Sequence, residues 1–308
     1  MLIVSAVLIL NGMGLCYLYA RQRIAAFDYV EQLGGQLESQ RPENWPTSIP
    51  VPRWMRSVTK VSITGRPCDF RQLAALPELR ELECTHSRID RRAYVGLSHF
   101  PQLKSLELLG TTVKDDDLTV IAACPRLSRL NLSATKVTDA GLRHLAATRI
   151  TELRLDDTLV SDEGVVYALR LPLQVLWLRR TLITDASLAQ LWSCPSLTAL
   201  CLDGTRITDN GLQDLGQLPL LRRLQLSDTH ISDTGLASLR LSSLQALYVD
   251  GTDITIDAIP TLEHISSLTM LQLSDPPFNK ENTRSLAAGR TWAYFSLVEG
   301  PGGGDESP

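Results

Sequence analysis

The chain has 308 residues, of which 44% are hydrophobic and 21% are charged, and its 30 basic and 34 acidic side chains leave a formal net charge of −4. This composition excludes a chain that is disordered throughout, because it holds enough apolar residues for a core of good size. The near balance of charge argues against a dedicated nucleic-acid-binding protein, which needs a concentrated basic surface to neutralise phosphates.

Residues 1–20 carry no charged side chain, and Arg21 and Arg23 follow them directly. Nineteen helical residues span about 28 Å, close to the thickness of the hydrocarbon layer of a membrane. We therefore expect a single-pass transmembrane anchor. The alternative is a signal peptide, cleaved so that the rest is secreted, although the basic residues that usually precede its apolar run are missing. The side of the membrane stays open, since the free amino terminus offsets part of the bias set by the arginines.

Residues 21–57 show two different patterns. Up to Leu37, apolar residues recur every three or four positions, which predicts a helix whose end two glycines weaken. Four prolines follow and predict an extended linker, because proline disrupts helices and central strands. We expect Trp45 and Trp54 in this linker to contribute to an amino-terminal cap over the exposed first edge of the fold that follows.

One apolar pattern, LxxLxL, then recurs ten times over residues 58–275. After a first interval of 21 residues, the copies begin 23 or 24 residues apart. A period of this length is typical of a solenoid, in which each copy forms one structural unit that stacks on the next. The copies begin at Val58, Leu79, Leu103, Leu127, Ile150, Leu173, Leu197, Leu221, Leu244 and Leu268.

Each copy has the features of a strand followed by a helix. Leucines at alternate positions, such as Leu130 and Leu132, point the same way along a strand and face a core. We expect a threonine column after the strands to satisfy backbone groups of neighbouring copies. A Ser–Asp or Thr–Asp pair then opens each helix, where the hydroxyl caps free amides and the carboxylate complements the positive helix end. Recurrent glycines predict close approach of successive copies: Gly141, Gly164, Gly211 and Gly235.

The copies LSRLNLSATKVTDAGLRHLA, from Leu127, and LTALCLDGTRITDNGLQDLG, from Leu197, resemble the leucine-rich repeat. The narrower pattern ITDxGL is similar to repeats of bacterial leucine-rich-repeat proteins, including membrane-anchored members, and to the cysteine-containing repeats of F-box substrate receptors. The resemblance implies an α/β solenoid of about ten repeats, with a curved parallel sheet on the concave side and helices outside. It also implies a non-catalytic scaffold for protein–protein interaction.

A second function stays open, that of an F-box-like substrate-recognition subunit of a ubiquitin ligase. The threonine column departs from the cysteine pattern of those receptors, and residues 21–57 contain no recognisable F-box segment. After the repeats, aromatic residues in 276–299 predict a carboxy-terminal cap, and the polar residues 300–308 predict a disordered tail. The cap aromatics are Phe278, Trp292, Tyr294 and Phe295.

Chemical motifs are missing from the sequence. It has no GxxxxGK phosphate loop, no HExxH, no GxSxG and no GxGxxG after a strand. Its five histidines form no cluster, and its six cysteines show neither a CxxC pair nor the spacing of a disulfide scaffold. We therefore expect no enzymatic activity, no cofactor, no metal site and no small-molecule substrate.

Strand residues between the core leucines must point to the opposite, concave side and form a binding surface. We expect a protein or peptide to bind at its middle, where Trp, Tyr and Arg side chains of the kind that dominate interfaces gather. The predicted contact residues are Arg154, Trp177, Arg179, Cys201 and Tyr248. The alternative is a purely structural role, with Arg179 between Asp156 and Asp203 in a cross-strand ion ladder.

Overall fold

The computed structural model describes residues 2–42, 48–216, 218–239, 243–275, 277–287 and 294–299. The chain divides into two compact units, unit 1 (Met1–Asn131) and unit 2 (Leu132–Pro308). Trp45, Trp292 and the predicted tail at 300–308 lie outside the described residues. So do the side chains of residues 1–14, Tyr294 and Phe295.

Unit 1 is a short parallel sheet that begins with one antiparallel strand. Strand β1 pairs antiparallel with β2, and β2 to β5 follow in chain order as parallel neighbours. The strands are β1 (Gln36–Gln40), β2 (Ser57–Thr64), β3 (Glu81–Thr85), β4 (Ser105–Glu107) and β5 (Arg129–Asn131). The helical segments are α1 (Leu2–Gln32), η1 (Arg53–Met55), η2 (Phe70–Leu73), η3 (Arg91–His99), η4 (Asp115–Asp117) and α2 (Leu118–Ile121).

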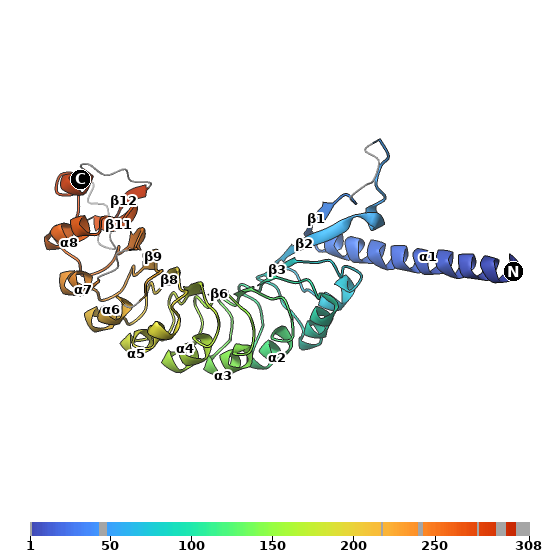
Figure 1. Ribbon diagram of the computed structural model, residues 1–308, viewed down its shortest axis with the longest axis horizontal. Coiled ribbons are helices and arrows are strands. Elements are labelled where there is room, and N and C mark those ends of the chain that lie inside the picture. The colour runs from blue at the N-terminus through green and yellow to red at the C-terminus, as the bar shows by residue number, and fades with distance from the viewer. Residues whose placement is uncertain are drawn as a thin grey trace, which may run out of the picture. The chain divides into compact units, whose positions relative to one another are not determined.

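Unit 2 repeats a strand and a short helical segment. Its helices α3 to α8 run along one side and its strands along the other (Figure 1). The strands are β6 (Glu152–Arg154), β7 (Val175–Trp177), β8 (Ala199–Cys201), β9 (Arg223–Gln225), β10 (Ala246–Tyr248), β11 (Met270–Asp275) and β12 (Tyr294–Glu299), all parallel. The helical segments are α3 (Asp139–Leu142), η5 (Arg143–Leu145), α4 (Asp162–Ala168), α5 (Asp185–Leu188), η6 (Leu191–Ser193), α6 (Asp209–Leu215), α7 (Asp233–Ser238), η7 (Ile256–Ala258), α8 (Ile259–His264) and α9 (Arg284–Ala287).

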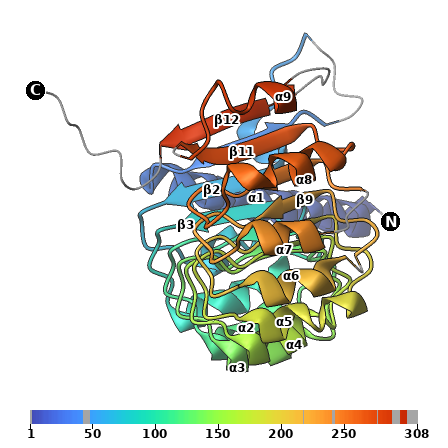
Figure 2. The same ribbon diagram turned by 90° about the vertical axis from the view of Figure 1, so that its left-hand side faces the viewer.

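Both units therefore have the architecture of a leucine-rich-repeat solenoid. The leucines at the centre of the short strands are at most 1% exposed, which places the core between the sheet and the helices. Beyond the last predicted repeat, β12 adds a parallel strand beside β11, as Figure 2 shows. Phe278, one of the predicted cap residues, is buried.

The amino-terminal helix ends earlier than its apolar pattern predicts. Helix α1 stops at Gln32, and Leu37, where the pattern predicts its end, lies in β1. Gly34 adopts a left-handed φ of 68°, which ends the helix. Gly35 then passes so close to β2 that an added Cβ would lie 2.7 Å from the carbonyl oxygen of Ser62. The two glycines thus turn the chain into an antiparallel strand that the periodicity did not predict.

The carboxy-terminal half of α1 packs against the rest of unit 1. Phe27 and Val30 are buried, and the Arg53 guanidinium lies 4.7 Å from the centre of the Phe27 ring. Arg23 is 2% exposed and pairs with Glu78, with further hydrogen bonds to the carbonyl oxygens of Ala75 and Arg56. Arg23 therefore stabilises the fold, and its charge is neutralised within unit 1.

Among the described residues, no helix combines the length and apolar character that a bilayer crossing requires. The transmembrane anchor predicted for residues 1–20 thus has no support from the structure, and most of its side chains lie outside the described residues.

The threonine column closes the turn of its own repeat. Each hydroxyl donates to the carbonyl oxygen three residues earlier, at distances of 2.5 to 2.7 Å. The prediction that these hydroxyls serve neighbouring repeats was wrong, because the tight turn after each strand brings a nearer acceptor into reach. The residues are Thr111, Thr135, Thr158, Thr181, Thr205, Thr229 and Thr252.

Aspartates at the helix starts join successive repeats of unit 2. Each carboxylate accepts the backbone N–H of the Ser or Thr that opens the next helix, at 2.8 Å, and its hydroxyl, at 2.5 to 2.6 Å. We call these contacts the aspartate clamps. The pairs are Asp139 with Ser161, Asp162 with Thr184, Asp185 with Thr208, Asp209 with Ser232 and Asp233 with Thr255.

The recurrent glycines make room for the aspartate clamps. An added Cβ at Gly164, Gly211 or Gly235 would overlap the carboxylate of the preceding repeat. Where Ser187 replaces this glycine, its hydroxyl donates to Asp162. The prediction of close approach is therefore confirmed at these three glycines, and the aspartates have a role between repeats that the sequence pattern did not reveal.

Candidate binding face

The pairing of the strands assembles the candidate site. In unit 2 we call the side chains of β6 to β11 that alternate with the buried leucines the open face. Its central row follows from the register of the parallel ladder. The row consists of Arg154, Trp177, Cys201, Gln225, Tyr248 and Gln272. The structure thus aligns four of the five predicted contact residues, and the fifth, Arg179, lies two residues after Trp177.

Arg154 and Trp177 form the aromatic centre of this face. The Arg154 guanidinium lies 5.0 Å from the centre of the indole ring, and it donates to Glu152 Oε1 at 2.9 and 2.6 Å. Both Arg154 and Trp177 are half-buried. A cation–π contact at such a site is worth about 0.5 to 1 kcal/mol. Glu152 and Arg154 therefore hold the indole in place while leaving part of its surface open to solvent.

The predicted ion ladder through Arg179 does not form. The Asp156 carboxylate accepts the backbone N–H of Arg179 at 2.8 Å, and the Asp203 carboxylate accepts that of Ser227 at 2.9 Å. Both acids are thus used by backbone groups at the end of the strand ladder. The Arg179 side chain is exposed, and the described residues place no carboxylate within 4.0 Å of it.

Cys201 lies in the central row but is not exposed on the face, contrary to the prediction. It is 2% exposed, because its short side chain lies in the row between the larger Trp177 and Gln225. Its thiol donates to Asp203 Oδ2 at 3.4 Å. Burial and the charge of Asp203 hold the pKa of this thiol well above its usual value. Cys201 therefore offers little contact area to a partner and is a poor nucleophile.

Tyr248 lines a polar hollow of about 220 Å³ on the open face. The Asp250 carboxylate, also in its wall, accepts hydrogen bonds from Ser227 at 2.6 Å and Gln272 at 2.7 Å. Burial raises the pKa of Asp203 to about 6. The lining residues are Arg179, Asp203, Gln225, Ser227, Asp228, Tyr248, Asp250 and Gln272.

The sequence pattern did not point to Asp228 in this hollow, because Asp228 lies beyond the strand residues that alternate with the core leucines. Its backbone has a left-handed φ of 55°, and the same turn position is left-handed in eight other repeats. The recurrence of glycine at this position was the sequence signal that could have marked the turn. The left-handed residues at this turn position are Gly65, His86, Gly110, Ala134, Asp157, Arg180, Gly204, Asp228 and Gly251.

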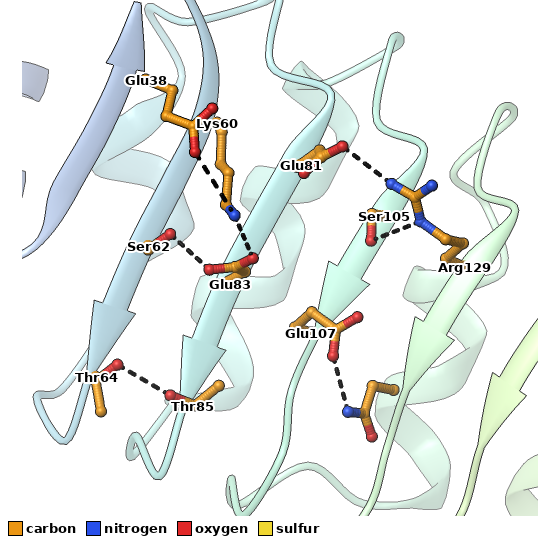
Figure 3. Close-up of polar contacts among 11 residues, drawn as sticks. Glu38, Lys60, Ser62, Thr64, Glu81, Glu83, Thr85, Ser105, Glu107 and Arg129 are labelled. Atoms are coloured by element: carbon orange, nitrogen blue, oxygen red, sulfur yellow. Dashed lines mark hydrogen bonds and ion pairs between the residues drawn. The ribbon is translucent and has the colours of Figure 1, made fainter. Parts of the chain in front are cut away.

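The corresponding sheet face of unit 1 is different in character, because its charged side chains pair with one another (Figure 3). Lys60 lies 2.7 Å from Glu83, and Arg129 lies 2.9 Å from Glu81. Glu107 likewise accepts a hydrogen bond of 2.8 Å from the amide of Asn131. This face has no aromatic side chain in the described strands β2 to β5.

Metal chemistry has no visible basis in the part of the chain that the structure describes. No group of three or more His, Cys, Asp or Glu side chains there could hold a metal ion. What the open face offers chemically is an aromatic surface, hydrogen-bonding groups and charges of both signs.

Comparison with known protein families supports the leucine-rich repeat. Residues 43–187 match a family model described as the leucine-rich repeats of an FBD-associated F-box protein, and residues 193–216 and 217–239 match a leucine-rich-repeat model. No curated protein matches the chain.

Among solved structures, an internalin, InlF, from Listeria monocytogenes is 18% identical, with 77% of this chain and 87% of that chain covered and a TM-score of 0.52. A second internalin, InlC2, from the same organism is 22% identical, with 70% and 80% covered and a TM-score of 0.43. The likeness to InlF shows a shared fold alone.

Proposed function

We propose that the chain is a non-catalytic scaffold that binds a protein partner on the open face of unit 2. The observation that carries this proposal is the half-buried Trp177, which Arg154 and Glu152 hold in place among polar neighbours. Partly exposed Trp, Tyr and Arg side chains in fixed positions are the residues that contribute most to protein interfaces.

The contrast between the two sheet faces supports the choice of unit 2. On unit 1, Lys60 and Arg129 are each paired with a glutamate, and the described strands β2 to β5 contain no aromatic side chain that could anchor a partner (Figure 3). On unit 2, Arg179 is exposed, and Trp177 and Tyr248 add half-buried aromatic side chains to the open face. The six parallel strands β6 to β11, about 4.8 Å apart, span roughly 24 Å, which is sufficient for a protein or peptide contact of ordinary size.

The test is crosslinking in intact cells from a photoreactive residue at position 177. Position 192 is the matched control, because Trp192 is 64% exposed but lies in η6, on the helical side of the same repeat. We expect one protein to be crosslinked from position 177 and not from 192. Equal crosslinking from both positions would contradict the proposal.

Affinity for the protein so identified is then measured with substituted chains. Trp177→Ala combined with Arg154→Ala is expected to weaken binding at least tenfold, because it removes the aromatic anchor and its support. Trp192→Ala is expected to bind like the unsubstituted chain. Thermal unfolding of each variant shows whether the repeats stay folded, and an unchanged affinity in the double variant would refute the site.

The alternative is substrate recognition for a ubiquitin ligase, which the match to repeats of an F-box protein favours. Such a receptor needs a helical adaptor-binding module before the repeats. Within the described part of residues 21–57, α1 ends at Gln32 and the antiparallel strand β1 follows. Failure of the full chain to capture any ligase subunit from a cell extract would eliminate this alternative.

A membrane tether is a separate proposal that rests on the sequence of residues 1–20, which lack charge, as in the membrane-anchored bacterial proteins that the repeats resemble. Resistance of the chain to alkaline carbonate extraction is expected, and protease accessibility would then show on which side the repeats lie. Extraction into the soluble fraction would refute the tether.

A further inference from the structure

At two apolar positions of the repeat, a single copy has cysteine where the other copies have a different apolar residue. They lie five and ten residues after the start of every copy, and all twenty side chains are at most 5% exposed. Eighteen of them are aliphatic or phenylalanine, and the exceptions are Cys84 and Cys68. The first set is Ile63, Cys84, Leu108, Leu132, Leu155, Leu178, Leu202, Leu226, Val249 and Leu273; the second is Cys68, Ile89, Val113, Val137, Val160, Ile183, Ile207, Ile231, Ile254 and Phe278.

These two exceptional residues meet in space. Cys84 lies on β3 in the second repeat, Cys68 follows β2 in the first, and their sulfur atoms are 3.3 Å apart. The two side chains are 0% and 3% exposed. The other buried cysteines that the structure describes, such as Cys124, have no sulfur neighbour of this kind.

The backbone on both sides of the pair is held in place. The N–H of Cys68 donates to the carbonyl oxygen of Arg88 at 3.2 Å, and Cys84 is paired with Ile63 in the parallel ladder. A disulfide bond has a length of about 2.05 Å, so the sulfur atoms need to approach by roughly 1.2 Å. A bond between these sulfur atoms requires that rotation of the two side chains covers this distance while the strand register stays as it is.

We propose that Cys68 and Cys84 are a disulfide-forming pair that links the first two repeats covalently under oxidising conditions. The oxidant is a low-molecular-weight disulfide such as oxidised glutathione. The two protein thiols lose two protons and two electrons to it, the new sulfur–sulfur bond forms, and the glutathione disulfide is cleaved to two glutathione thiols.

The state in which the bond forms follows from burial. The hydrogen bond to Cys68 and desolvation raise the pKa of the Cys84 thiol, so the reactive thiolate is scarce in the folded protein. Exchange with a dissolved disulfide therefore takes place while the chain folds or when the first repeats open locally. Once formed, the bond closes the loop between residues 68 and 84, which restricts the unfolded chain and stabilises this end of the array.

The experiment refolds the full chain in a buffer of oxidised and reduced glutathione, blocks free thiols in denaturant and digests with trypsin. Cleavage at arginine and lysine yields residues 61–71, which contain Cys68, and residues 81–88, which contain Cys84. We expect mass spectrometry to find these two peptides joined, with the loss of two hydrogens. Finding both thiols blocked, or either joined to a different cysteine, would overturn the proposal.

Two variants complete the test. Cys68→Val introduces the residue that Val113 and Val137 provide at the same repeat position, so the core stays filled and only the bond is lost. Cys124→Ala removes a buried cysteine without a partner thiol and serves as the matched control. Oxidation is expected to raise the thermal unfolding midpoint by several degrees in the unsubstituted chain and in Cys124→Ala. An equal rise in Cys68→Val would show that the pair is not its source.

Discussion

The aspartate clamps between repeats make a sharp prediction for Asp162. Its carboxylate accepts the N–H of Thr184 at 2.8 Å, the hydroxyl of Thr184 at 2.6 Å and the hydroxyl of Ser187. A hydrogen bond to a charged group contributes at least about 1.5 kcal/mol to stability. At a half-buried site, water can take the place of the lost partner in the variant and so recovers part of this energy. Asp162→Ala is therefore expected to lower the free energy of unfolding by about 2 to 4 kcal/mol.

The assay is urea unfolding followed by circular dichroism, with two companion variants. Asp162→Asn keeps an oxygen for the Thr184 N–H but loses the charge, so about half of the loss is expected. Glu163→Ala removes an exposed acid from the same first turn of α4, and so measures the interaction with the helix dipole alone, about 0.3 to 1 kcal/mol. If Asp162→Ala and Glu163→Ala lose the same stability, the clamp contributes nothing and our reasoning is refuted.

The pH dependence gives a second check on Asp162. Burial pushes the pKa of this carboxyl up, but hydrogen bonds from Ser187 and Thr184 outweigh burial and lower it overall. A lowered pKa in the folded state means that the contribution is present above the unfolded pKa of about 4 and is lost as the pH falls through the folded value. The stability difference between the unsubstituted chain and Asp162→Ala should therefore shrink below about pH 4.

Three further predictions follow from single positions. Gly235→Ala should lower the free energy of unfolding, measured in urea, by roughly 2 kcal/mol, because the new methyl group overlaps Asp209. Gly216→Ala is the control: its added Cβ would have no atom closer than 3.7 Å, so the loss of stability should be less than about half as large. Ala134→Gly should raise the unfolding free energy by roughly 1 kcal/mol, since Ala134 has a φ of 53° that glycine adopts without strain; a loss of stability would contradict this. Cys201 should react with iodoacetamide at pH 8 much more slowly than a free cysteine, because its pKa is raised by burial, and rapid labelling would reopen the question of catalysis.

The repeat period alone determined the sheet and its register. Because a strand alternates its side chains between two faces, the spacing of the leucines was sufficient to align Arg154, Trp177 and Tyr248 in one row. The same pattern predicted the close approach at the recurrent glycines. Each of these features is set within one copy of the repeat and recurs in the next copies, so the pattern of one copy is sufficient to predict them.

Only the tertiary structure decided what each polar or sulfur-containing side chain does. Asp203 was expected to pair with Arg179, but it accepts the N–H of Ser227, which the strand ladder leaves without a partner. The contact between Cys68 and Cys84 likewise depends on how two successive coils stack. Periodicity gives the face on which a side chain lies, whereas its partner is set by distances between repeats, and these exist only in the folded chain.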